Sequence, residues 1–307
     1  MSVTAEAVKQ LRERTGAGMM ECKKALVDTG GNLDSAAELM RKQGLAKADK
    51  KATRVAAEGV VVLEKSADGH TATLLEVNCE TDFVAREADF QRFAADVVKA
   101  AASSGAQDVD TLAAAKLASG QSVDEARRGL VAKIGENISV RRVAQLQSTG
   151  LLGAYLHGSR IGALVALSGG DAALAHDLAM HVAASNPRYL AFADVPAAEV
   201  AKEREILLER AKSSGKPPEI VAKMVEGQLR KAFNDVSLMG QLFVKDDKQT
   251  VEQLLKKAAA SVKGYRRFEV GAGIEKKHDD FVGEVMKQVQ DSTKNKPTDD
   301  GKSPSKH

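Results

Sequence analysis

One stretch organises this chain, Asn78-Cys-Glu-Thr-Asp-Phe-Val-Ala-Arg86. It lies where an apolar strand, Leu74 to Val77, gives way to a polar helix from about Asp89, so we expect it to be a loop. Residue type alone favours burying Phe83 in the core, with Asp82 capping a turn, because Phe is among the residues most often buried. The alternative is that the ring is displayed to a partner, and these residues by themselves leave both interpretations open.

The bulk composition is that of an ordinary soluble chain. Its 307 residues are enough for two or three domains with a large core. A formal net charge of +3, with 28% charged residues, is too small to indicate nucleic-acid binding by bulk electrostatics. Aromatic residues make up 4% and Trp is absent, which argues against a stacking platform for single-stranded nucleic acid.

The sequence lacks the usual patterns of disulfide frameworks, zinc sites, membrane spans and signal peptides. Cys22 and Cys79 lie far apart and form no Cys-x-x-Cys pair, so neither a disulfide framework nor a zinc site is indicated. No apolar run reaches the ~18 residues that a membrane span needs. The first residues lack the basic and apolar segments of a signal peptide. We therefore expect a cytoplasmic protein that does not contact a membrane.

Residues 1–55 predict a small three-helix domain and a linker. The helices are expected from a Thr4 cap to Gly16, from Met19 to Val27, and from Asp34 to Gly44, followed by a basic linker helix from Lys47 to Arg54. A core of this size suits binding a partner rather than chemistry. Met19 and Met20 lie about 100° apart on a helix, so at least one is exposed, either as a domain-edge residue or as a soft partner contact.

Residues 56–148 change to strand periodicity. Two apolar runs, Val60–Leu63 and Thr71–Val77, flank Asp68-Gly69, a dipeptide that favours a tight hairpin turn. Helical spacing follows from Phe90 to Val98, and the capping box at Ser122 opens another helix that runs to about Ile134 and ends at Gly135. A third strand is expected over Ile138–Val143.

The same order of elements returns in residues 149–194 and 235–278. It comprises a hairpin of Leu151–Leu156 and Ile161–Leu167 around Gly158, a helix over Ala175–Ala184, a capping box at Thr250, and a strand over Tyr265–Val270. The fold class predicted is therefore α+β, with a duplicated core of two small antiparallel sheets and packed helices.

The second copy contains an insertion, residues 195–234. One charged helix is expected from Pro196 to Lys212 and another from Glu219 to Phe233, joined by a Gly-Pro turn. Their narrow apolar seams consist of Val200, Leu207 and Ala211 on one helix, with Ile220, Met224 and Val225 on the other. The pattern predicts a protruding antiparallel coiled-coil hairpin. After the core we expect a C-terminal helix over 279–291 and a disordered polar tail over 292–307.

No catalytic constellation emerges from the motifs. His176 and His181 are five residues apart and do not form the i, i+4 zinc pair. Gly158-Ser-Arg-Ile-Gly162 has its Ser in the wrong position for a nucleophile elbow, and Gly271-Ala-Gly lacks the third glycine of a dinucleotide loop. No phosphate-binding Gly-x-x-x-x-Gly-Lys-Ser/Thr run occurs, so we expect no direct nucleotide binding.

Several linked motifs carry a resemblance. They are Leu11-Arg-Glu-Arg-Thr-Gly-Ala-Gly-Met-Met-Glu-Cys-Lys-Lys-Ala-Leu26, Glu76-Val-Asn-Cys-Glu-Thr-Asp-Phe-Val84, Val131-Ala-Lys-Ile-Gly-Glu-Asn-Ile138, His181-Val-Ala-Ala-Ser185 and Arg267-Phe-Glu-Val-Gly271. Together, over about residues 3 to 280 and in the right order, the chain closely resembles the bacterial elongation factor Ts family, in its long form with the coiled-coil insertion. The amino-terminal domain would then be the family's three-helix, UBA-like domain, which docks on the partner's nucleotide-binding domain.

The resemblance implies a guanine-nucleotide exchange factor for elongation factor Tu, with no catalytic residues, no cofactor and no metal of its own. It would dislodge Mg²⁺ from the partner's nucleotide site and stabilise the nucleotide-free state until GTP binds. By motif, the residues that dislodge Mg²⁺ would be Thr81, Asp82, Phe83 and Val84. The partner-binding residues would be Arg12, Met19, Met20, Lys23, Ile134, Gly135 and, by a more local match, His157.

Two other functions have some support in the sequence. A basic RNA- or ribosome-binding protein would use the segment from Lys47 to Arg54 and the Arg-Arg strands, but alternation along a strand puts at most one Arg of each pair on a given side. A small-molecule enzyme would require convergent polar groups that the motifs do not supply. Because helical hairpins often pair, a homodimer or a 2:2 complex with the partner stays open.

Overall fold

The structure is a computed structural model that describes residues 3–212 and 217–275. Within that part of the chain helices and small antiparallel sheets are mixed, which confirms the α+β class. The C-terminal helix expected over 279–291 and the tail over 292–307 lie outside the described residues.

The amino-terminal helices are α1 (Ala5–Thr15), α2 (Met19–Asp28) and α3 (Leu33–Lys51). The Thr4 hydroxyl accepts a hydrogen bond from the Ala7 amide at 3.2 Å, and Gly16 ends α1 at a φ of 66°, as the sequence predicted. A small apolar core joins the three helices through Val8, Leu11, Cys22, Ala25, Leu26 and Ala36.

The prediction that Gly44 ends the third helix was wrong. α3 continues through Gly44 to Lys51, so the expected linker helix is its last part. Gly44 lies against Ala132 of α7 (Val123–Ile134), where an added Cβ would come within 2.9 Å of the Ala132 Cβ. The glycine is needed for the close approach of two helices, and its cost in helix propensity, about 1 kcal/mol, is too small to break α3.

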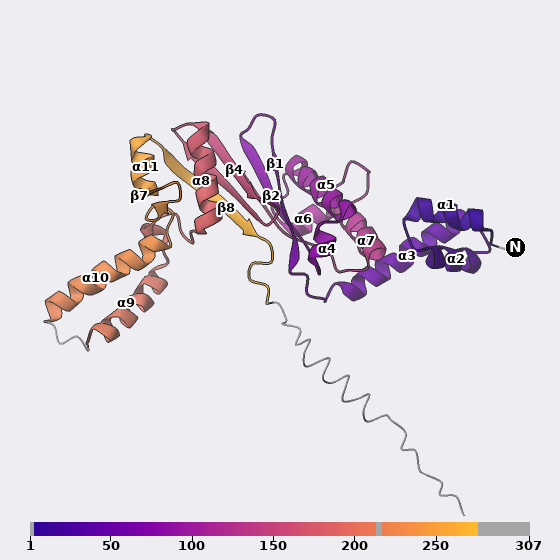
Figure 1. The fold of residues 1–307 in the computed structure, drawn as a ribbon, viewed down its shortest axis with the longest axis horizontal. Coiled ribbons are helices and arrows are strands. Elements are labelled where there is room, and N and C mark those ends of the chain that lie inside the picture. The colour runs from indigo at the N-terminus through magenta and orange to yellow at the C-terminus, as the bar shows by residue number, and fades with distance from the viewer. Residues whose placement is uncertain (1–2, 213–216, 276–307) are drawn as a thin grey trace, which may run out of the picture. The chain divides into compact units, whose positions relative to one another are not determined.

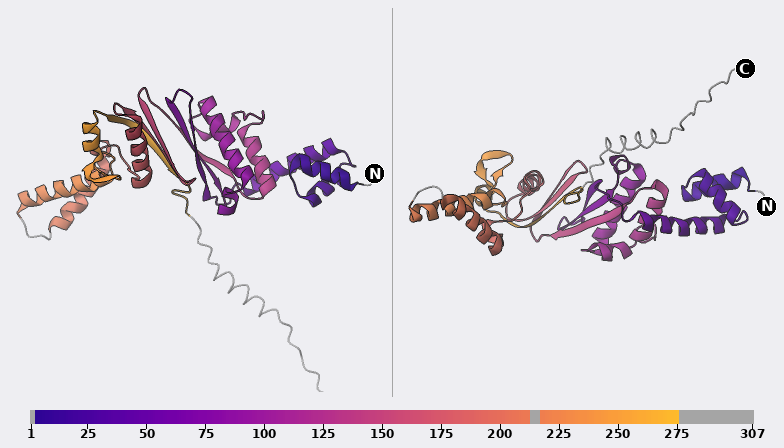
Figure 2. Two further views of the ribbon diagram at one scale, coloured as in Figure 1. Left: turned by 45° about the horizontal axis from the view of Figure 1, so that its top comes forward. Right: turned by 90° about the horizontal axis from the view of Figure 1, so that it is seen from below.

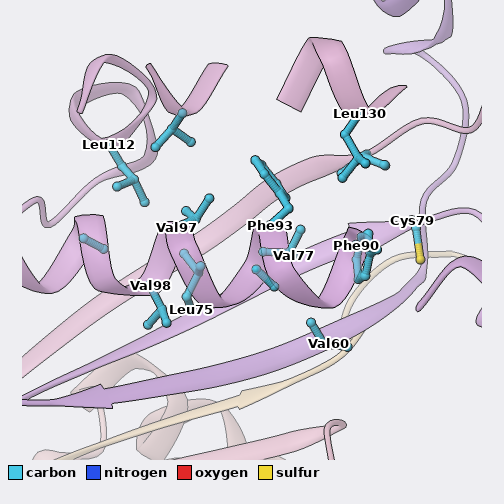
Figure 3. Packing of buried hydrophobic residues seen from close by; sticks show 14 of the residues in the cluster. Val60, Leu75, Val77, Cys79, Phe90, Phe93, Val97, Val98, Leu112 and Leu130 are labelled. Carbon is cyan, nitrogen blue, oxygen red and sulfur yellow. The ribbon is translucent and has the colours of Figure 1, made fainter. Parts of the chain in front are cut away.

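The first half of the core is a sheet of order β1-β2-β3, with helices packed on one face. Its elements are β1 (Glu58–Lys65), β2 (Thr71–Cys79), α4 (Asp82–Ala85), α5 (Ala88–Ser104), α6 (Val109–Ala114), α7 and β3 (Ser139–Gln147). Leu75 and Val77 of β2 pack against Phe90 and Phe93 of α5 in a fully buried cluster (Figure 3). The capping box predicted at Ser122 and the αL stop at Gly135 are both confirmed.

The second half repeats this order with a sheet of order β4-β5-β8. Its elements are β4 (Leu151–His157), β5 (Ile161–Ser168), α8 (Ala172–Ser185), a 3₁₀ turn (Phe192–Asp194), β6 (Leu242–Phe243), β7 (Asp246–Thr250), α11 (Val251–Lys257) and β8 (Ser261–Glu269). Leu178 and Val182 of α8 cover Val165 and Leu167 of β5. The small β6–β7 pair was not predicted, because β6 is only two residues long.

The two sheets pack face to face, which leaves the helices α5 and α8 on the outer faces (Figures 1 and 2). Val61 and Leu74 of the first sheet meet Leu164 and Phe268 of the second in one buried cluster. Gly162 sits at the closest approach, since a Cβ there would lie 2.6 Å from the Leu74 Cδ1. Alternation along each central strand thus serves two cores, one toward helices and one between sheets.

A buried carboxylate of the first sheet forms hydrogen bonds at the interface between the two sheets. Glu76 of β2 is fully buried and accepts from Arg141 Nη1 at 3.0 Å, Arg142 Nε at 2.5 Å and the Gly271 amide at 2.8 Å. The pairing of β2 with β3 skips Arg141, and this bulge turns both arginines toward one carboxylate. The expectation that only one Arg of the pair faces a given side was wrong, and both are now engaged internally rather than free for phosphates.

The helices α9 (Ala197–Lys212) and α10 (Pro218–Asp235) lie side by side and antiparallel (Figure 1). Their shared core contains Val195, Leu207, Ala211, Val225, Leu229 and Phe233. Ile220 is 49% exposed, so its placement in the apolar seam was wrong. Ile220 lies in the first turn of α10, whereas the seam continues through Leu229 and Phe233 toward the other end of that helix.

Candidate functional site

The stretch Asn78–Arg86, expected to be a loop, begins with the last two residues of β2 and contains a one-turn helix, α4. Thr81 is its N-cap, and the Thr81 Oγ1 accepts a hydrogen bond from the Val84 amide at 3.3 Å. Val84 and Ala85 turn into the core of the first half, each only 8% exposed. Phe83 lies on the opposite side of the turn and is 79% exposed, more than any other large apolar residue found exposed in the described chain. The interpretation of Phe83 as a core residue was wrong.

Asp82 does not have the capping role that residue type suggested. The Thr81 side chain caps the turn, and the Asp82 carboxylate instead pairs with Arg86 at 2.8 Å across one helical turn. The Asp82 side chain is 48% exposed and the Arg86 side chain 78%, so solvent screens the pair and it adds little to stability. Asp82 and Phe83 are therefore neighbouring polar and apolar groups presented to solvent on one side of α4.

Glu136 fixes the beginning of this turn from a distant part of the sequence. Its carboxylate accepts from the Thr81 amide at 3.0 Å and from the Thr81 hydroxyl at 2.7 Å. Glu136 directly follows Ile134 and Gly135, which end α7, with Gly135 at a φ of 89°. The sequence-predicted residues Ile134 and Gly135 are thus brought next to Thr81 by the same segment.

A second carboxylate holds the approach to α4. Glu80 accepts from the Asn137 amide at 2.5 Å and pairs with Arg54 at 2.8 Å. The Asn137 side chain in turn donates to the Arg54 carbonyl at 2.7 Å. Sequence reasoning missed Glu80, Asn137 and Glu136 as supports. They stand inside the quoted motifs, but their partners lie far away in sequence, and only the fold pairs them.

Cys79 is a structural thiol. It is fully buried, and its Sγ donates to the Thr81 carbonyl at 3.1 Å. Burial, with the negative charge of Glu136 nearby, raises the pKa of the Cys79 thiol to about 12. The side chain therefore stays protonated at neutral pH, where it supports the turn rather than acting as a nucleophile.

Four of the other predicted docking residues line a groove on α1 and α2. The groove has a volume of about 430 Å³ and is lined by Val3, Ala5, Val8, Lys9, Arg12, Met19, Met20 and Lys23. Met19 is 59% exposed and Met20 74%, although the spacing required only one to be exposed. Flexible thioethers beside three cationic side chains make a surface suited to an apolar segment with acidic flanks.

His157 ends β4 and is exposed, with its Nδ1 3.3 Å from the Tyr155 hydroxyl. The turn that follows contacts β1, because the Ser159 carbonyl accepts from the Val61 amide at 2.7 Å and Arg160 pairs with Glu58 at 2.8 Å. Glu58 is in turn the strand partner of Cys79. The turn after His157 therefore adjoins the strand end from which α4 begins.

None of the helices in residues 3–212 and 217–275 is long and apolar enough to cross a membrane. Nor do those residues bring together three His, Cys, Asp or Glu side chains in a group that could hold a metal ion.

A buttressed turn that displays an aromatic ring, and a groove of exposed methionines edged with cations, are features of a protein that acts by binding another protein. A family model described as Elongation factor TS matches residues 80–272. The chain is 56% identical over 293 residues to an elongation factor Ts of Methylococcus capsulatus, covering 95% of this chain and all of that protein.

Other relatives agree in name and extent. An elongation factor Ts of Alkalilimnicola ehrlichii is 55% identical over 293 residues, and one of Legionella pneumophila strain Paris is 53% identical over 289, covering 100% and 99% of those proteins and 95% and 94% of this chain. The chain belongs to the elongation factor Ts family. Membership implies a protein of translation elongation that promotes nucleotide exchange on elongation factor Tu.

Proposed function

We propose that this protein is a guanine-nucleotide exchange factor for elongation factor Tu that works by dislodging Mg²⁺ from the partner's nucleotide site. Thr81, Asp82, Phe83 and Val84 form the inserted turn, which we call the wedge. The protein binds no nucleotide or cofactor, supplies no acid or base, and stabilises the nucleotide-free partner until GTP binds. It acts in the cytoplasm, where its partner works in translation.

The observation that carries this proposal is the exposure of Phe83 on a rigid support. A phenylalanine that is 79% exposed leaves most of its apolar surface in water, which free energy disfavours unless a partner covers it. Val84 and Ala85 anchor the same turn in the core, so the ring is presented without a large loss of conformational entropy on binding. Burying the ring in a partner would contribute about 1.5–3 kcal/mol.

That energy is enough for one or two decades of exchange rate, since each ~1.4 kcal/mol is a factor of ten. A GTPase holds GDP through backbone amides around the phosphates and through Mg²⁺ that bridges to a phosphate oxygen. A wedge that shifts the backbone near this ion removes the bridge, so the nucleotide loses contacts that Phe83 itself never touches. Coupling is reciprocal, so bound GDP must weaken the factor's affinity as much as the factor weakens GDP.

The remaining affinity comes from docking surfaces. We assign partner contacts to Arg12, Met19, Met20, Lys23, Ile134, Gly135 and His157. Arg12, Met19, Met20 and Lys23 share the groove on α1 and α2, and Ile134 and Gly135 adjoin the wedge through Glu136. Docking at these positions would hold Phe83 against one place on the partner. A 2:2 complex paired through the α9–α10 hairpin would be distinguished from a 1:1 complex by sedimentation.

The test is release of a fluorescent GDP from purified elongation factor Tu in a stopped-flow instrument. We expect Phe83→Ala to lower the release rate at saturating factor about 10- to 100-fold. Phe192→Ala is the control, because Phe192 is also exposed, at 36%, but lies in the second half. A wild-type protein that fails to accelerate release would overturn the exchange function, and an active Phe83→Ala would remove only the wedge.

A further inference from the structure

We propose that Glu136 is a positioning residue for nucleotide exchange, which holds the wedge in the conformation that presents Phe83. This inference rests on the proposed function and deepens it. The hydrogen bonds of the Glu136 side chain go to Thr81 rather than to Asp82 or Phe83. It acts through Thr81, the residue that caps the turn on which Phe83 stands.

The hydrogen bonds around Thr81 have a direction that Glu136 sets. A threonine hydroxyl has one hydrogen to donate and lone pairs that accept. Because the carboxylate of Glu136 can only accept, the Thr81 hydroxyl donates to it at 2.7 Å, and its lone pairs are left for the Val84 amide at 3.3 Å. The Thr81 amide is fixed by the same carboxylate at 3.0 Å. Glu136 therefore orients the cap, and the cap orients α4.

A helix of one turn depends on such a cap. α4 spans only Asp82–Ala85, too short to be stable through its own backbone hydrogen bonds. Without the bonds to Glu136, the Thr81 hydroxyl can rotate and the turn can open, so Phe83 would sample several directions. The Cys79 thiol also donates a hydrogen bond to the Thr81 carbonyl at 3.1 Å, but this sulfur donor is weak.

The segment that contains Glu136 also connects the wedge to the docking surfaces. Gly135, the preceding residue, is one of the proposed partner contacts, and its carbonyl accepts a hydrogen bond from the Lys51 ammonium at the end of α3. A partner that contacts Gly135 or displaces α3 therefore acts on the residue next to the carboxylate that holds Thr81. The geometry couples docking to the presentation of Phe83 through one residue.

The test is a double-mutant cycle on the release of a fluorescent GDP from elongation factor Tu. We expect Glu136→Ala to lower the saturating release rate by about tenfold, which stays within the loss expected for Phe83→Ala because Glu136 acts only by presenting that ring. Glu136→Gln should fall between Glu136→Ala and wild type, because an amide keeps one acceptor oxygen. In a Phe83→Ala background, Glu136→Ala should have almost no further effect, since Glu136 acts only by presenting that ring.

The chain offers a matched control in Asp108. Its carboxylate makes the same pair of bonds, to the Thr111 amide at 2.7 Å and the Thr111 hydroxyl at 2.9 Å, at the N-cap of α6. Asp108→Ala removes the same chemistry from the same half of the core, so it should lower stability while leaving the release rate within about twofold of wild type. Equal losses of activity in the two variants would mean a general loss of stability and would overturn the proposal.

Three results separate the possible failures. A folded Glu136→Ala with the wild-type release rate, or one that slows Phe83→Ala by a further tenfold, would refute the positioning role. If Glu136→Ala does not fold, Thr81→Val removes the hydroxyl donor while keeping the carboxylate, and the same cycle with Phe83→Ala applies. If the wild-type protein itself leaves GDP release unchanged, the proposed function fails. Hydrogen exchange of the Thr81 amide in wild type and Glu136→Gln then shows separately whether Glu136 holds Thr81 by hydrogen bonds.

Discussion

The two halves of the core treat the same connection differently. In each half a central strand runs into a long helix, β2 into α5 and β5 into α8. In the second half the connection is Gly169-Gly-Asp171, which turns directly into α8. Gly169 adopts a φ of 77° and lies so close to the backbone that an added Cβ would be 2.3 Å from the Ala259 carbonyl oxygen. That connection displays no large side chain.

In the first half the connection runs over residues 80–87, contains α4, and displays Phe83. The two halves otherwise share one scaffold. Each has three antiparallel strands, with the second strand of the hairpin (β2 or β5) in the centre, and one long helix on the outer face. The exposed ring is therefore carried by an addition to a connection, and this addition is held by side chains that the shorter connection does not need. Glu80 and Glu136 are those side chains.

The faces that meet between the sheets differ as well. The first half contributes the charged Glu76, whereas β5 contributes the apolar Leu164 and Ala166. Glu76 also receives the amide of Gly271, whose φ of 73° and approach to the Ala57 carbonyl oxygen exclude any other residue. The charged side of the interface thus joins the carboxyl end of the second half to β2 of the first.

Replacing the buried Glu76 with an apolar residue should have the largest effect on stability. Glu76→Leu leaves two half-buried guanidinium groups without their carboxylate, and we expect a loss of about 3–5 kcal/mol in the free energy of unfolding. Replacing all three side chains, with Arg141→Met and Arg142→Met added, should recover much of that loss. Urea unfolding of the three proteins measures both changes, and a Glu76→Leu as stable as wild type would show that the charge cluster contributes nothing.

The features that the sequence predicts correctly depend on local signals. The cap at Thr4, the capping boxes at Ser122 and Thr250, and the hairpin turn at Asp68-Gly69 each depend on neighbouring residues, and each is present. The exposure of Phe83 did not follow from local signals. It required the family resemblance, because residue type favoured burial.

The errors share one cause, contacts between residues distant in sequence. The sequence predicts a helix stop at Gly44 because the close approach of Ala132 cannot be seen in it. The bulge at Arg141 depends on pairing with β2, and without it the Arg pair had to alternate. Glu136 went unassigned for the same reason, since its partner Thr81 stands 55 positions earlier in the chain.

The helix layers of the two halves should also respond differently to acid. α5 buries apolar residues, but α8 buries His181, which accepts from the Val244 amide at 3.2 Å and lies 3.1 Å from the Gln241 Oε1. Burial lowers the pKa of His181 below its usual value, so the folded state keeps this group neutral. The stability this group contributes is complete above pH ~6.5 and is lost as the pH falls below it, by up to about 1.4 kcal/mol per pH unit.

Hydrogen exchange between pH 7.5 and 5 tests this difference, after correction for the intrinsic pH dependence of exchange. We expect protection in α8 to fall on acidification, and protection in α5 to change less. In His181→Asn the side-chain oxygen can still accept from the Val244 amide but cannot titrate, so the acid-dependent loss in α8 should shrink. Equal acid sensitivity in wild type and His181→Asn would assign the loss to other groups.

The smallest effect separates a cap that only supports a helix from a cap that also presents a side chain. Asp171 and Thr81 both follow a central strand, and each accepts a hydrogen bond from an amide three residues later, at 2.8 Å from Leu174 and 3.3 Å from Val84. Asp171→Ala should cost about 1 kcal/mol of stability and leave GDP release unchanged, because that connection displays no large side chain for a partner to cover. Thr81→Ala removes the same kind of cap together with the hydroxyl's hydrogen bond to Glu136, while the backbone amide keeps its own bond, and should slow release as well. Thermal unfolding measures the loss of stability in each variant, and stopped-flow release measures the loss of exchange activity. We expect a loss of stability in both variants and a loss of activity only in Thr81→Ala. If Asp171→Ala slowed release as much as Thr81→Ala, the second connection would be part of the exchange machinery, and the difference between the halves would not mark the functional site.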